Sequence, residues 1–287
     1  LKYFPQPLTK VFLVNSGSAA TDLALRMARN YTGRKKIAAI EHGYHGNTAA
    51  GIEISHYKFS GKGGSGATEN VLTLPLPDTY RGEFNINNGS AGHSYASQAI
   101  KQIQNSTAKI AAFIAEPIVG CGRQVPLAKG YLKNIYAEIR KAGGVCISDE
   151  VQTGFGRLGN VFWGFESQSV IPDMVILGKP MGNGHPMGAV VTTNEIADAF
   201  NNGMEFFSSF GGNPVSCAVG KTVLDVLEEE QLQQNANSVG DYYLQQLSGL
   251  QQKHECIGDV RGSGLFIGFE LVKDRLSLLP DTNLAGK

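Results

Sequence analysis

The sequence predicts a layered α/β fold built around a mostly parallel sheet. Three observations lead to this prediction: short apolar runs are nearly continuous, amphipathic stretches separate them, and glycines follow the amphipathic stretches. Near-continuous apolar runs are typical of parallel strands covered on both faces, and alternation with helices favours a parallel sheet between helical layers. We expect buried strands at residues 11–14, 36–40, 110–115, 144–148, 174–177 and 189–192.

The stretches between these strands carry helical periodicity. In residues 19–30, Leu23 and Met27 are four positions apart, and Gly33 follows as a C-cap. Residues 131–141 show the same pattern. The alternation therefore extends through most of the chain.

The C-terminal part has a different rhythm. Helical patterns at residues 215–230 and 239–252 precede a partly alternating segment at 265–272, which indicates an antiparallel strand. We therefore expect a large domain over residues 1–224 and the start of a smaller, truncated α+β domain over 225–287.

Composition limits the class of partner. Apolar residues are 42% and charged residues 17% of the 287, which predicts a folded chain. Lys+Arg and Asp+Glu both number 25, so no net field favours nucleic acid or an anionic membrane, and no apolar run is long enough to span a bilayer. This charge balance favours a small-molecule ligand. We expect a cytoplasmic location, with a mitochondrial one as the alternative, because the cysteines are widely separated: Cys121, Cys146, Cys217 and Cys256.

The strongest functional signal is an amine and a carboxylate that each follow a buried strand. Lys179 comes after the run at 174–177 and opens a Gly-rich loop, while Asp149 follows the run at 144–148. A buried carboxylate needs a cation, and a lysine near positive charge or shielded from water can form an imine. The pair indicates a cationic heterocycle held between a Schiff base and an anion, which is the chemistry of pyridoxal phosphate.

Other interpretations of Lys179 and Asp149 compete with a pyridoxal-phosphate site. Lys179 alone fits a surface lysine at the start of a loop. Asp149 with Glu150 fits a Mg²⁺ site, although the G-x-x-x-x-G-K-[ST] loop that often accompanies one is missing. Beside Asp149, Val151 is placed to press on a ring face and Gln152 to reach a phenolic oxygen.

Two further turns follow predicted strands. Residues 15–18, Asn-Ser-Gly-Ser, precede the first helix and suit an anion at its N-terminus, or else an ordinary N-cap at Ser18. Tyr44 follows residues 36–40 and suits an aromatic cofactor. His42 and His45 form an H-x-x-H pair without a further ligand cluster, so zinc is not expected and a structural role for His45 stays open.

One motif is a decoy. Residues 61–66 match G-x-G-x-x-G, but they follow no clear strand and open no helix. A dinucleotide site needs that context, so we expect a flexible loop.

In this order, the motifs N-S-G-S, Y-H-G, A-E-P, D-E-V-Q-T-G-F-G-R, G-K-P-M-G-N-G and F-G-G-N-P resemble those of class III aminotransferases, pyridoxal-phosphate enzymes of fold type I. The resemblance implies that Lys179 forms the internal aldimine, Asp149 pairs with the pyridine nitrogen and Gln152 contacts the ring oxygen.

The resemblance also implies contacts to the rest of the cofactor. Tyr44 and Val151 would cover the two ring faces and Glu116 would lie near the ring; the phosphate would be held by Gly17 and Ser18, and by Ser209 of a second subunit. A homodimer with shared active sites follows from the role of Ser209.

The resemblance implies transfer of an amino group from an amine or amino acid to a keto acid. The segments S-H-Y-K-F and P-D-T-Y-R-G are similar to the ethanolamine-phosphate phospho-lyase branch, and F-G-G-N-P is shared with the alanine–glyoxylate aminotransferase branch. Phosphate elimination is therefore one alternative, and a non-catalytic pyridoxal-phosphate-binding module of a longer protein is another.

Overall fold

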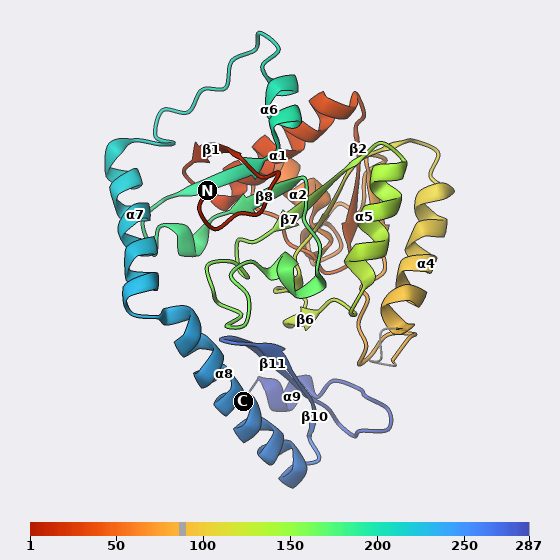
Figure 1. Ribbon diagram of the computed structural model, residues 1–287. Helices are drawn as coiled ribbons and strands as arrows, with labels where there is room; N and C mark the ends of the chain where they lie inside the picture. The colour runs from red at the N-terminus through yellow and green to blue at the C-terminus, as the bar shows by residue number, and fades with distance from the viewer. Residues whose placement is uncertain (86–89, 287) are drawn as a thin grey trace.

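The computed structural model describes residues 1–85 and 90–286, and over these residues seven strands form one sheet in the order β1-β9-β8-β7-β4-β2-β3 (Figure 1). The strands are β1 Lys10–Val14, β2 Lys36–Ile40, β3 Val71–Leu74, β4 Ile110–Ala115, β7 Val145–Asp149, β8 Met174–Leu177 and β9 Gly188–Thr192.

The sheet is mostly parallel, as predicted. Strands β8, β7, β4, β2 and β3 pair in parallel, whereas β9 is antiparallel to both β8 and β1. Strand β1 therefore points in the same direction as β8. All six expected strands form, with ends that differ by at most one residue, and β3 is a seventh strand of the sheet.

Helices cover both faces of the sheet, which gives the expected α/β/α layers. Helices α1, α2 and α6 pack on one face, and α4 and α5 pack on the other (Figure 1). The helices of this part are α1 Gly17–Thr32, α2 Ala49–Ile54, α3 His56–Phe59, α4 Ser90–Gln104, α5 Tyr131–Lys141 and α6 Asn194–Phe200, with two 3-10 turns, η1 Gly164–Gln168 and η2 Lys179–Met181.

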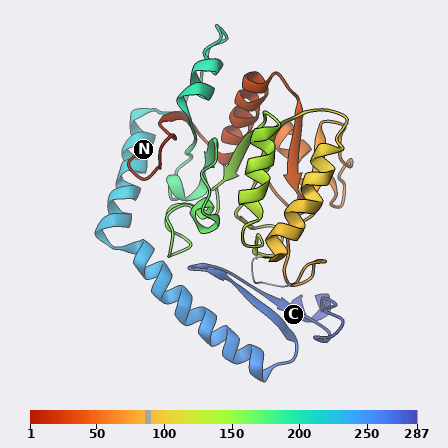
Figure 2. The same cartoon turned by 45° about the vertical axis from the view of Figure 1, so that its right-hand side comes forward.

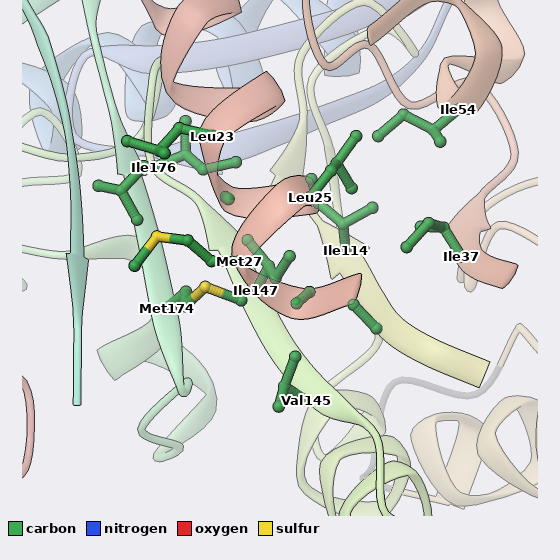
Figure 3. Packing of buried hydrophobic residues seen from close by; sticks show 14 of the residues in the cluster. Leu23, Leu25, Met27, Ile37, Ile54, Ile114, Val145, Ile147, Met174 and Ile176 are labelled. Carbon is green, nitrogen blue, oxygen red and sulfur yellow. The ribbon is translucent and has the colours of Figure 1, made fainter. Parts of the chain in front are cut away.

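Helix α1 anchors the face of the sheet that carries the larger core cluster. Leu23, Leu25 and Met27 are almost fully buried and pack with Ile147 and Ile176 of the sheet (Figure 3). Each fully buried side chain of this size contributes about 1.5–3 kcal/mol of transfer free energy. Burial of this stripe fixes α1, and therefore its N-terminus, at the carboxyl ends of the strands.

The caps of α1 agree with the sequence at one end only. Gly33 ends the helix in the left-handed conformation (φ 65°), and its N–H donates to Arg29 O. The N-cap is Ser16, whose Oγ accepts from Ala19 N, so the ordinary cap at Ser18 is wrong. The hydroxyl of Ser18 is left for other contacts.

The C-terminal part lies beyond the carboxyl edge of the sheet as a long helix and a hairpin (Figure 2). The expected antiparallel strand forms and pairs with the segment just before it. The elements are α7 Pro214–Glu229, α8 Leu232–Lys253, β10 Ile257–Ser263, β11 Phe266–Leu271 and α9 Thr282–Ala285; a small hairpin of the large domain joins β5 Ile118–Val119 to β6 Val125–Pro126. The boundary expected at residue 224 falls within α7 and stays a prediction.

The structure also bears on the Gly-rich segment, the cysteines and the absence of a membrane span expected from the sequence. Residues 61–66 form an exposed loop between α3 and β3, so the G-x-G-x-x-G match has no dinucleotide context. All four cysteines lie within the described residues and are free. Across the described part of the chain, none of the helices has the length and apolar character needed to cross a bilayer.

Candidate active site

The site is a cavity of about 150 Å³ at the carboxyl ends of the strands. Because β1, β2, β4, β7 and β8 all point the same way, the residues that follow them meet at one edge of the sheet, where open α/β sheets bind ligands. Eight of the nine predicted site residues line the cavity: Gly17, Ser18, Tyr44, Glu116, Asp149, Val151, Gln152 and Lys179.

Asp149 is the buried anion of the cavity. It ends β7 and is 4% exposed; its Oδ1 accepts from Val151 N at 3.1 Å. Its Oδ2 lies 2.8 Å from His45 Nδ1, and because a carboxylate only accepts, Nδ1 carries the proton. Among residues 1–85 and 90–286, no lysine or arginine lies within ion-pair distance of Asp149. The carboxylate can therefore receive a cation from a ligand.

Glu116 places a second carboxyl group beside Asp149. Its Oε1 accepts from Tyr44 N at 3.1 Å and its Oε2 from Gly120 N at 3.0 Å. Burial, followed by the negative charge of Asp149, raises the pKa of Glu116 to about 7. Two buried carboxyl groups on this wall of the cavity favour a cationic group.

The N-terminus of α1 also lines the cavity. The amides of Gly17 and Ser18 belong to the first turn, where the unpaired N–H groups and the helix dipole favour an anion. Ser18 Oγ accepts from Asn47 N at 3.0 Å, which leaves its own proton free to donate. Gly46 packs against Ser18 with φ 118°, and a Cβ at Gly46 would lie 3.0 Å from Ser18 Oγ.

Lys179 lies at the rim of the cavity that holds the Asp149 carboxylate and the N-terminus of α1. Gly178 joins β8 to η2, and a Cβ at Gly178 would lie 3.0 Å from Gly17 Cα, so only glycine lets the two turns approach this closely. Lys179 begins η2 and is exposed, with its side chain on the lining of the cavity. The amine is thus accessible to a ligand that spans the anionic and cationic poles.

Tyr44, Val151 and Gln152 line the rest of the cavity. Tyr44 is half-buried, and burial raises its pKa, so its hydroxyl stays neutral. Val151 is packed against Gly17, where a Cβ would lie 3.0 Å from Val151 Cγ2. Gln152 lies against the Gly120 turn, since a Cβ at Gly120 would lie 2.2 Å from Gln152 Nε2.

Glu150, the neighbour of Asp149, does not face the site as a ligand. Its two oxygens accept four hydrogen bonds from protein groups, and the residue is fully buried. No group of three or more His, Cys, Asp or Glu side chains suited to a metal ion occurs in the described parts of the chain. The Mg²⁺ interpretation therefore has no support from the geometry.

Ser209 is the predicted site residue that lies outside the cavity. It is exposed on the segment between α6 and α7 (Figure 1), which packs against edge strand β1 at Gly211, where a Cβ would lie 2.2 Å from Leu13 O. An exposed position is what a contact to a second subunit requires.

Four further residues line the cavity that were not singled out as site residues, although Ser16 and His45 lie in motifs noted in the sequence: Ser16, Thr21, His45 and Gly46. The H-x-x-H pattern drew attention to His45 but not to its partner, because His45 and Asp149 are 104 positions apart. The Tyr-His-Gly context was the available signal, since it placed His45 next to a predicted site residue.

Comparisons with known proteins agree with this geometry. The family model described as aminotransferase class III matches residues 1–282. The chain is 51% identical over 289 residues to the alanine–glyoxylate aminotransferase 2-like protein of Drosophila melanogaster, covering 98% of this chain but only 58% of that protein. The chain thus spans less than two thirds of its curated relative.

Solved structures are similar over nearly the whole chain. A phospholyase from Arthrobacter in complex with phosphoethanolamine has a TM-score of 0.90 and 38% identity, covering 99% of this chain and 67% of the other. An amine transaminase from an uncultivated Pseudomonas species, in a PLP-bound form, has a TM-score of 0.85 and 30% identity, with 97% and 66% covered.

Proposed function

Because this chain belongs to the class III aminotransferase family, we propose that it is the cofactor-binding part of a pyridoxal-phosphate enzyme that transfers an amino group from an amine or amino acid to a keto acid. The observation that carries the proposal is one cavity that joins Lys179, the buried carboxylate of Asp149 and the N-terminus of α1. A ligand with an aldehyde, a protonated ring nitrogen and a phosphate matches those three features.

The residues present fit that cofactor. Asp149 would pair with the ring nitrogen, because it is buried without a lysine or arginine partner among the described residues. The Gly17 and Ser18 amides would hold the phosphate at the helix N-terminus. Tyr44 and Val151 would cover the ring faces.

The reacting side of the ring would lie toward the remaining lining residues. Gln152 would donate to the ring oxygen, and Glu116 would lie near the ring. When bound, the cofactor supplies an electron sink for the α-carbon of the substrate. The amine of Lys179 would remove the proton from that carbon and, for transfer of the amino group, would deliver it to the aldehyde-derived carbon of the cofactor.

The role of Lys179 can be tested by attachment of the cofactor. Pyridoxal phosphate added to the chain should give visible absorbance, and borohydride reduction should leave the cofactor on the peptide that contains Lys179. Lys179→Ala should abolish both signals, whereas Lys62→Ala, in the exposed loop after α3, should change neither. Retained absorbance in Lys179→Ala would contradict the assigned role.

Phosphate elimination is a second candidate, supported by the similarity to a phospholyase bound to phosphoethanolamine. Single-turnover spectra separate the two reactions: conversion to the pyridoxamine form with alanine denotes transfer, and release of phosphate from phosphoethanolamine denotes elimination. Bound cofactor with neither result would favour a non-catalytic module of a longer protein.

We also propose a homodimer with shared sites. The segment around Ser209 exposes the apolar side chains of Met204 (66%), Phe207 (79%) and Phe210 (70%), and such a patch is typical of an interface. In a dimer, the hydroxyl of Ser209 would reach the phosphate of the second subunit. Sedimentation at micromolar concentration should give twice the mass of one chain. The cytoplasmic location stays a prediction.

A further inference from the structure

The turn between β5 and β6 holds two consecutive residues in an unfavourable backbone conformation. Arg123 has φ 78° and Gln124 has φ 51°, and neither is a glycine. Residues other than Gly, Asn and Asp rarely adopt this left-handed backbone conformation, and two such residues in a row persist only when surrounding contacts hold them. The turn therefore needs an external support.

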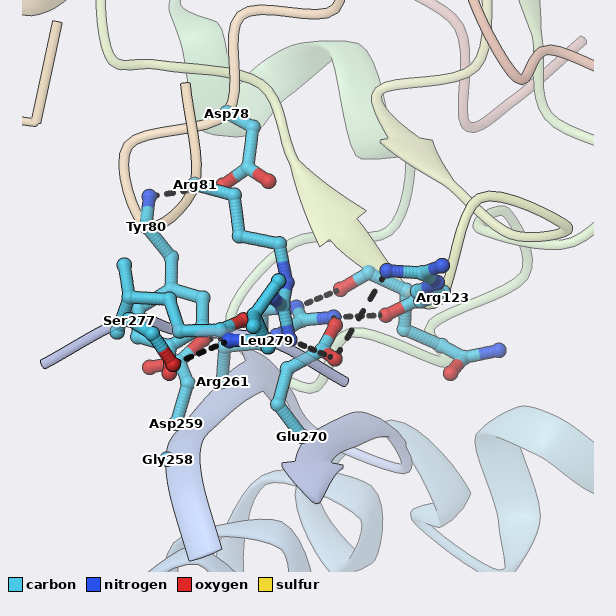
Figure 4. Close-up of polar contacts among 12 residues, drawn as sticks. Asp78, Tyr80, Arg81, Arg123, Gly258, Asp259, Arg261, Glu270, Ser277 and Leu279 are labelled. Carbon is cyan, nitrogen blue, oxygen red and sulfur yellow. Dashed lines mark hydrogen bonds and ion pairs between the residues drawn. The ribbon is translucent and has the colours of Figure 1, made fainter. Parts of the chain in front are cut away.

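Arg261, on β10 of the C-terminal hairpin, provides that support. Its Nη2 donates to Arg123 O at 2.5 Å and its Nε donates to Gln124 O at 3.1 Å, so one guanidinium binds both carbonyls (Figure 4). The side chain is 11% exposed. A planar fork of donors can make this pair of contacts, whereas a lysine ammonium supplies a single point.

Two carboxylates hold the guanidinium in place. Arg261 Nη1 donates to Asp259 at 2.8 Å and Nη2 to Glu270 at 2.6 Å. Glu270 also accepts from Arg81 Nη2 at 2.9 Å (Figure 4). Arg81 thus shares a carboxylate with Arg261, and its hydrogen bonds go to Glu270 and to Leu278 O rather than to the turn.

The supported turn continues into the cavity. The Gln124 side chain donates to Gly120 O at 3.1 Å, and Gly120 N–H donates to Glu116 Oε2 at 3.0 Å. On its other side Gly120 abuts Gln152 Nε2. A continuous set of hydrogen bonds therefore leads from Arg261 to Glu116, and a packing contact of Gly120 extends it to Gln152.

We propose that Arg261 is a positioning residue, which fixes the turn at residues 120–124 so that Gly120 holds Glu116 and Gln152 in the geometry that the cofactor needs. The proposal rests on the proposed function. It makes the C-terminal hairpin, which contributes no residue to the lining of the cavity, a determinant of the site.

Arg261→Gln and Arg81→Gln form a matched pair, because both remove a contact to Glu270 and only the first removes the contacts to the turn. In the full chain, Arg261→Gln should weaken binding of pyridoxal phosphate at least fivefold and shift the visible absorption maximum. Arg261→Gln and Arg81→Gln should lower the unfolding temperature by similar amounts. In Arg81→Gln, however, the affinity should stay within twofold of that of the unaltered chain. Arg261→Lys should behave like Arg261→Gln.

Gly120→Ala perturbs the inner end of the same set of contacts, since its Cβ would collide with Gln152 Nε2. It should reproduce the spectral shift without touching the arginines. The proposal is overturned if Arg261→Gln and Arg81→Gln change affinity and absorption equally.

Hydrogen exchange separates failure of this proposal from failure of the proposed function, because it needs no cofactor. Arg261→Gln should speed exchange of the Gly120 amide at least tenfold relative to Arg81→Gln. If the unaltered chain binds no pyridoxal phosphate, this difference still supports the positioning role, and equal exchange rates refute it.

Discussion

Replacement of Glu150 by glutamine tests whether the second carboxylate of the D-E-V-Q segment is a structural anchor. Glu150 is fully buried, and each of its oxygens accepts one backbone N–H and one hydroxyl. Phe165 N (2.9 Å) and Ser148 Oγ (3.0 Å) donate to Oε1, and Gly164 N (2.8 Å) and Thr153 Oγ1 (2.7 Å) donate to Oε2.

A glutamine cannot satisfy this set of donors. Whichever side its amide NH₂ takes, that group faces a backbone N–H that cannot turn away, although the hydroxyl on that side can rotate to accept. An unsatisfied buried donor costs about 1–3 kcal/mol. Burial raises the pKa of Glu150, so loss of the buried charge returns part of this cost. We expect Glu150→Gln to lower the free energy of unfolding by about 2 kcal/mol.

Glu150→Ala should cost more, about 4 kcal/mol, because both backbone donors lose their partner and a cavity remains. Urea unfolding followed by circular dichroism measures both values. The matched control is Glu138→Gln on the surface of α5, where the carboxylate accepts from Gln104, and its effect should stay within about 0.5 kcal/mol. A value for Glu150→Gln as small as that of the control would refute the reasoning.

Two other changes act on the site itself. Gly17→Ala adds a Cβ 3.0 Å from Val151 Cγ2, which overpacks the start of α1 at a cost of about 1–3 kcal/mol. A fluorescence titration should then show binding of pyridoxal phosphate weakened by about tenfold or more. Unchanged affinity would show that the turn at Gly17 and Val151 can expand. Burial and the charge of Asp149 raise the pKa of Glu116 to about 7 from an ordinary 4.5, so the folded chain keeps a proton that the unfolded chain has lost. The free energy of unfolding of the cofactor-free chain should therefore fall as the pH rises from 4.5 to 7, and it should fall less in Glu116→Gln. Urea unfolding at pH 5 and pH 8 measures this fall, and an equal fall in the two proteins would contradict the shifted pKa.

The strands were predictable because each is a near-continuous apolar run, and the site residues followed from the strand ends. Helix α4, Ser90–Gln104, was missed because four of its six buried positions are Ala or Gly, which give little hydrophobic contrast. Helix α8 begins at Leu232, seven positions before the expected start, since its first turns are rich in Gln and Asn. Packing of α8 against β10 supplies the stability that its own sequence does not signal.

The support of the turn at residues 120–124 was beyond sequence reasoning for a different reason. Left-handed backbone is usually signalled by Gly or Asn, and Arg123 and Gln124 carry no such signal. Their conformation depends on Arg261, more than 130 positions later. Contacts of this kind depend on tertiary structure, whereas Lys179 and Asp149 could be found because each follows its own local strand.

The charge of the cavity joins these two levels. Strands β4 and β7 are neighbours in the sheet, and the carboxylates of Glu116 and Asp149 follow directly at their ends, so the parallel topology itself brings two like charges together in a buried place. Burial, followed by this repulsion, raises the pKa of Glu116 to about 7. A protonated ring nitrogen at Asp149 would remove the repulsion, so binding of pyridoxal phosphate should lower the pKa of Glu116. The electrostatic cost that the fold imposes on the empty cavity is thereby a source of its affinity for a cationic ring.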